Sequence, residues 1–122
     1  MAESKEYIVR SGEDGNVNIS EDVIGIIALE AMREIEGFAA PAAVPAKDFS
    51  GFIGKKTGAR GVKVTQLENG VEVDAYVTLR QGCSVSKTAC ALQDAVKSAV
   101  EDMTGVAVEA VNIHVSGISF DK

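Results

Sequence analysis

The segment from 70 to 80 constrains the fold of this chain more than any other, because its side chains alternate in polarity at every step. Its apolar positions are Val71, Val73, Ala75, Val77 and Leu79, and between them lie Glu72, Asp74, Tyr76 and Thr78. Successive side chains of a strand point to opposite faces, so this period of two predicts a strand with one buried and one wet face. A similar run, Val62 to Leu67, precedes it, and the intervening Asn69-Gly70 is a turn signal whose residues readily take positive φ. The two runs predict a β-hairpin in a sheet that is covered on one side.

Helical periodicity precedes the hairpin. Ser20 offers a side-chain oxygen that can cap a first turn carrying Glu21 and Asp22, and Gly37 is a typical residue just beyond a helix. Apolar side chains between these signals recur at steps of three and four, which predicts an amphipathic helix. The expected buried face consists of Ile24, Ile27, Ala28, Ala31 and Ile35, widened by Val23 and Ile26.

A second amphipathic helix is predicted after the hairpin. Ser84 or Ser86 can cap its start, and Gly105 marks its end. Lys87, Asp94 and other charged residues are expected on its wet side. Its expected buried stripe consists of Val85, Ala89, Leu92, Val96, Ala99 and Met103.

Extended segments lie near the two ends of the chain. The predicted pieces are 7–9, 17–19 and a long last strand at 108–120, whose alternation Gly117 interrupts. The resulting order of strand, helix, strand, strand, helix, strand predicts an α+β fold. We expect a two-layer sandwich with a largely antiparallel sheet and two helices on one face. The length of 122 residues fits a single domain over 1–122, with 1–6 as a flexible tail. In the last strand, Val111, Ile113 and Val115 should face one side, and Asn112, His114 and Ser116 the other.

The charge and hydropathy of the chain limit its partners and its location. A formal net charge of -6 argues against general nucleic-acid binding, because phosphate contacts require a concentration of Lys and Arg. The first residues show neither the cationic start nor the apolar stretch of a secretory signal. No segment approaches the roughly 20 apolar residues that cross a bilayer. We therefore expect a cytoplasmic protein without a membrane span, in which Cys83 and Cys90 stay reduced.

Residues 38–60 show no periodicity and form a long predicted loop rich in Gly, Ala and Pro. Between Ala46 and Lys63, five of the twelve basic residues of the chain surround one acid, Asp48. The sequence Gly51-Phe52-Ile53-Gly54 fits the GxxG clamp with which KH domains hold a nucleic-acid backbone. A KH clamp joins two helices, however, whereas this one leads into a strand, so a mobile basic loop is the preferred interpretation. Nucleic-acid binding through Lys55, Lys56, Arg60 and Lys63 is the alternative function.

Side chains that could carry chemistry are sparse. His114 is the only histidine, and Cys83 and Cys90 lie seven residues apart, which is not the spacing of a CxxC redox motif. A zinc site needs three or four N or S ligands, and these three residues would have to supply nearly all of them. No GxSxG motif marks a nucleophilic serine. We therefore expect no catalytic residue, no metal site and no cofactor, and an enzyme using His114 with either cysteine is a third, weaker hypothesis.

Several short segments, taken in their order and spacing, resemble the alkaline shock protein family, also called the envelope stress response family, of Gram-positive bacteria. The resemblance extends from Gly15 to Phe120. It includes the run from Gly15 to Ser20, Phe52-Ile53-Gly54-Lys55-Lys56, Gly61-Val62-Lys63-Val64, Val73-Asp74-Ala75-Tyr76-Val77, Met103-Thr104-Gly105 and Val111-Asn112-Ile113-His114-Val115.

This resemblance implies a non-enzymatic, abundant cytosolic protein of the cell-envelope stress response. It also implies that the chain forms homo-oligomers and is held at the inner face of the membrane by an integral membrane partner. The family has no established catalytic residues, so none is carried over. Cys83, Cys90 and the Ala/Pro-rich stretch Ala39 to Ala46 depart from the family pattern. The residues that we predict to make interactions are Lys55, Lys56, Arg60, Lys63, Tyr76, Asn112 and His114.

Overall fold

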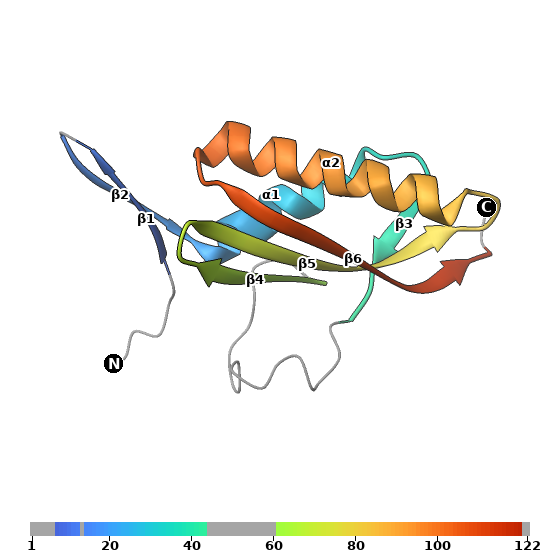
Figure 1. The fold of residues 1–122 in the computed structure, drawn as a ribbon. Coiled ribbons are helices and arrows are strands. Elements are labelled where there is room, and N and C mark those ends of the chain that lie inside the picture. The colour runs from blue at the N-terminus through green and yellow to red at the C-terminus, as the bar shows by residue number, and fades with distance from the viewer. Residues whose placement is uncertain (1–6, 13, 44–60, 121–122) are drawn as a thin grey trace.

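The computed structural model describes residues 7–12, 14–43 and 61–120 of the chain (Figure 1). Two helices lie together on one face of the main sheet, which confirms the predicted α+β fold in two layers. The elements are β1 (Tyr7–Gly12), β2 (Gly15–Ser20), α1 (Glu21–Arg33), β3 (Phe38–Pro41), β4 (Val62–Leu67), β5 (Gly70–Arg80), α2 (Val85–Thr104) and β6 (Val108–Ser119).

Strand β5 is the centre of the main sheet. On one of its edges, β4 pairs antiparallel with the first half of β5 and β3 pairs antiparallel with the second half. On the other edge, β6 pairs parallel with β5 from Val71↔Val108 to Arg80↔Ser119. A parallel neighbour needs a crossover connection, and α2 supplies it. Two of these three pairings are antiparallel, so the sheet is largely antiparallel, as predicted.

The structure corrects the expected role of the N-terminal strands. Strands β1 and β2 pair only with each other and form a two-stranded hairpin that projects from the body (Figure 1). Val17 of β2 is 59% exposed, so this strand has no buried apolar face that would fix it to the main sheet. The position that we expected for it is taken by β3, at the start of the predicted loop 38–60. Phe38 explains this strand, since its ring is only 6% exposed. Residues 44–60 of that loop lie outside the described residues.

The helix face of the sheet forms the core, as the alternation in β5 predicts. Val71, Val73, Ala75, Val77 and Leu79 are all 0% exposed. The helices cover them with Ile24, Ala28, Leu29 and Met32 of α1 and with Leu92, Val96 and Val100 of α2.

The predicted helix caps are confirmed, but the predicted buried faces are partly wrong. The Ser20 hydroxyl accepts a hydrogen bond from the Val23 backbone N–H, and Ser84 rather than Ser86 caps α2. Gly105 ends α2 with a φ of 75°. The buried stripe of α2 runs at steps of four from Thr88 to Val100, because a helix on a twisted sheet presents a stripe that winds around its axis. Val23 and Ile26 are each 44% exposed, Val85 is 44% exposed and Met103 is 71% exposed.

The β4–β5 hairpin is confirmed, but the reason for its glycine differs from the prediction. Leu67 pairs with Gly70, so the two loop residues are Glu68 and Asn69, and neither Asn69 nor Gly70 has a positive φ. A Cβ atom at Gly70 would instead lie 2.3 Å from the carbonyl oxygen of Ala107. The same oxygen accepts a hydrogen bond from the Val71 N–H at 2.9 Å. Position 70 therefore needs glycine because the chain entering β6 passes close to it.

Candidate interaction surface on the sheet

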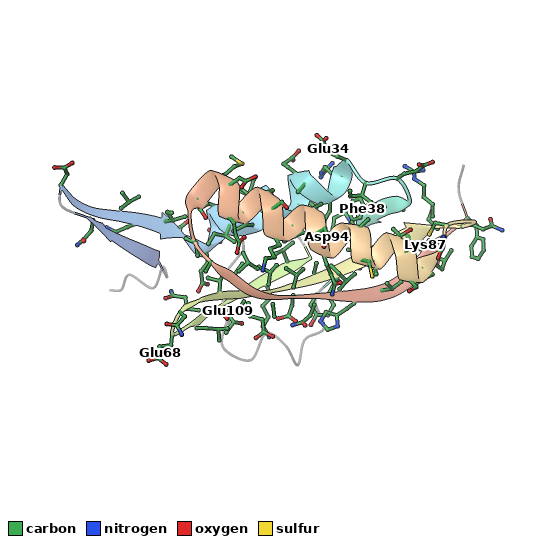
Figure 2. The ribbon with its side chains drawn as sticks, turned by 45° about the horizontal axis from the view of Figure 1, so that its top comes forward. Glu34, Phe38, Glu68, Lys87, Asp94 and Glu109 are labelled. Atoms are coloured by element: carbon green, nitrogen blue, oxygen red, sulfur yellow. The ribbon has the colours of Figure 1, made fainter. Side chains whose placement is uncertain are left out.

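The face of the main sheet that is turned away from the helices carries the candidate site, here called the open face. Polar side chains project from it on the side opposite α2 (Figure 2). Cross-strand pairing brings three strands together in rows, because residues directly opposite one another point to the same face. The rows are Thr65, Glu72 and Ala110; Lys63, Asp74 and Asn112; and Tyr76 with His114.

A hydrogen-bond network connects β5 to β6 on the open face. The Asn112 side-chain amide donates to Glu72 Oε2 at 2.8 Å and to Asp74 Oδ1 at 3.0 Å. His114 Nε2 lies 3.0 Å from the same Asp74 oxygen. One amide therefore holds two carboxylates, and the shared carboxylate orients the imidazole. The side chain of Asp74 is only 15% exposed, so this network is a built part of the sheet.

An aromatic stack completes the network. The rings of Tyr76 and His114 lie 4.4 Å apart between centroids, with an angle of 12° between their planes. Tyr76 is 6% exposed, whereas the His114 side chain is 44% exposed. The imidazole thus has one face on the tyrosine ring and an edge on a carboxylate, which fixes its position. What the open face offers a partner is a rigid polar surface with negative charge and one half-exposed imidazole.

The structure brings together three of the predicted interaction residues and tests only one more. Tyr76, Asn112 and His114 meet on the open face, and Lys63 lies across β5 as the pairing neighbour of Asp74. Lys55, Lys56 and Arg60 lie outside the described residues, so the nucleic-acid alternative that depends on them stays a prediction.

Sequence analysis missed the two carboxylates that organise the site. Glu72 and Asp74 accept both hydrogen bonds of the Asn112 amide. The alternation of β5 already placed them on the same face as Tyr76. The missing information was the parallel pairing with β6, which connects residues 38 and 40 positions apart in the chain.

The two cysteines do not join this site. Cys83 packs partly buried against the core, and Cys90 is exposed on α2. Both belong to the helix layer or its start, whereas His114 lies on the opposite side of the sheet. Within residues 14–43 and 61–120, no group of three or more His, Cys, Asp and Glu side chains could hold a metal ion. In the same part of the chain, no helix is both long enough and apolar enough to span a membrane.

The fold and the open face define a small α+β domain that presents a rigid polar sheet to a partner. The chain belongs to the alkaline shock protein 23 (ASP23) family, which has a cell envelope-related function, and the match covers residues 10–120. This confirms the resemblance seen in the sequence.

Three relatives illustrate the family. The chain is similar to the uncharacterized protein YqhY of Bacillus subtilis, with 33% identity over 88% of this chain and 79% of the relative. It is 36% identical to the uncharacterized protein Spy1535 of Streptococcus pyogenes over 88% of this chain and 82% of the relative. It is also 32% identical to the uncharacterized protein YloU of Bacillus subtilis, covering 85% and 88% of the two chains. No solved structure matches the chain significantly.

Proposed function

We propose that this chain is a non-enzymatic adaptor of the cell envelope, which self-associates and binds an integral membrane protein at the cytoplasmic side of the membrane. The observation that carries the proposal is the network of Asn112 with Glu72, Asp74 and His114. Its side chains hold one another in place on an open sheet face. A surface of this kind suits recognition of a partner, because its shape and charge are fixed before binding and little side-chain entropy is lost.

The chemistry of the network supports binding rather than turnover. A histidine paired with a carboxylate becomes a catalytic base only beside a group whose proton it can take. The imidazole of His114 instead lies stacked on the Tyr76 ring. The cell envelope-related function of the family supports the envelope part of the proposal. The role in response to alkaline stress rests on the same family relationship.

Membrane fractionation of native cells tests the adaptor. We expect the wild-type chain to sediment with membranes and to co-purify with an integral membrane protein. The double variant Asp74→Asn/His114→Ala should weaken that association, because it removes the charge and the imidazole from the open face. Glu36→Gln is the matched control, since Glu36 is exposed beyond α1 and away from the sheet. Recovery of the wild-type chain only in the soluble fraction would contradict the adaptor. So would substrate turnover by purified protein that depends on His114.

A further inference from the structure

The outer edge of β6 is the feature of this fold that the open face does not explain. Strand β6 is twelve residues long and pairs with β5 alone among the described strands. An edge strand presents N–H and C=O groups that can pair with another chain, and proteins normally protect such edges.

The first part of this edge is protected by side chains of α2. Gln93 Nε2 donates to the Val111 carbonyl at 2.9 Å, and Lys97 Nζ lies 3.4 Å from the Val108 carbonyl. The Val108 N–H donates to Glu101 Oε2 at 3.0 Å. These contacts identify Val108 and Val111 as residues whose backbone groups point away from β5.

The same geometry shows where the protection stops. In a parallel pair, residues that bond to the neighbouring strand alternate with residues that point outward. The register with β5 is continuous from Glu72↔Ala110 to Val77↔Val115, so Ile113 and Val115 point outward in phase with Val111. Among the described residues, none bonds to the outward backbone groups of Ile113 or Val115. A register shift between Val115 and Gly117 then ends the regular edge.

The exposed part of the edge carries little charge. Glu109, labelled in Figure 2 near the β4–β5 turn, is the last acidic residue before it, and His114 is the only titratable side chain from 110 to 120. Edges that avoid pairing usually carry Lys, Pro or other charges. The whole chain has a formal net charge of -6, so two copies repel one another least where they meet through an uncharged segment.

The segment is also complementary to itself. Val111-Asn112-Ile113-His114-Val115 reads apolar, polar, apolar, polar, apolar in both directions. An antiparallel copy centred on Ile113 would match every outward backbone group and keep apolar side chains on the helix face. It would place Asn112 opposite His114 of the second copy on the open face. Val115 is 36% exposed and would gain cover in such a pair.

We propose that a second copy of this chain pairs antiparallel with β6 through Val111–Val115, on a two-fold axis at Ile113. The proposal rests on the self-association in the proposed function and names its interface. It joins the two main sheets into one and brings the two open faces side by side. The dimer therefore presents a doubled binding surface to the membrane partner.

Directed disulfide cross-linking tests the register. Opposite residues in a non-hydrogen-bonded antiparallel pair lie about 4.5 Å apart between Cα atoms, which suits a disulfide. In a Cys83→Ser/Cys90→Ser background, Asn112→Cys and His114→Cys are oxidised separately and then as a mixture. We expect at least a fivefold excess of cross-linked dimer in the mixture over either variant alone. Stronger cross-linking of His114→Cys with itself would overturn the axis at Ile113.

A charged substitution on the edge tests the interface itself and separates it from the proposed function. Val115→Lys should reduce the oligomer to a monomer at concentrations where the wild type associates, measured by light scattering after size exclusion. Val17→Lys is the matched control, because Val17 is an exposed valine on the projecting hairpin, and it should leave the mass unchanged. Oligomers that persist with Val115→Lys would overturn the β6 interface and leave self-association intact. A wild type that is monomeric throughout would contradict the proposed function as well.

Discussion

The two faces of strand β5 show how this fold divides its tasks. On the helix face, five side chains from Val71 to Leu79 are completely buried. On the open face, the intervening Glu72 and Asp74 take part in a hydrogen-bond network with β6. One strand thus supplies the core and the binding surface through alternate residues. Substitutions one position apart should therefore affect stability and recognition separately.

Removal of a core side chain should give the largest loss of stability. Leu79→Ala empties part of a fully buried site on the helix face, so we expect the free energy of unfolding to fall by about 2–5 kcal/mol. Denaturant unfolding followed by circular dichroism measures this loss. Thr78→Ala, on the neighbouring position of the open face, is the control. Equal losses for the two variants would remove the distinction between the faces.

A substitution at Gly70 sharpens the comparison at the end of the strand where the two faces meet. A methyl group there would meet the Ala107 carbonyl oxygen at 2.3 Å, so Gly70→Ala should cost about 1–3 kcal/mol of unfolding free energy. Gly82→Ala is the control, since a Cβ at Gly82 has no heavy atom within 4 Å and only its φ of +94° opposes the change. A larger effect at Gly82 would show that conformation, not close approach, selects these glycines.

Breaking the network should cost less stability than damaging the core. Asn112→Ala leaves two carboxylates without their shared donor, but both lie at a partly exposed surface. We expect a loss of about 1 kcal/mol in unfolding free energy, together with weaker membrane association. Asn69→Ala in the exposed β4–β5 turn should change neither quantity. A loss as large as that of Leu79→Ala would make the network part of the core.

The smallest effect is expected at a residue that the sequence wrongly assigned to the buried stripe of α2. Met103 is 71% exposed, so Met103→Ser should change the unfolding free energy by no more than about 0.5 kcal/mol. Leu92→Ala, in the true buried stripe, is the comparison. Thermal unfolding of the two variants measures the difference, and similar transition temperatures would support the original assignment.

Local patterns in the sequence predicted the elements better than their partners. Alternation identified β5 and its buried face, and Ser20 and Gly105 marked helix ends that the structure confirms. Alternation assigns a side chain to a face but does not name the neighbouring strand. For this reason the pairing of β1 with β2 and the contact of Asn112 with Asp74 had to come from the structure. Strand β3 was missed because four residues are too few to show a period.

Self-association of the purified chain is the central claim, and light scattering after size exclusion tests it most directly. The chain has a mass of 12.7 kDa. The account predicts that the measured mass rises with concentration to at least twice this value, and that Val115→Lys suppresses the rise. A wild-type mass that stays at 12.7 kDa at every concentration would contradict it.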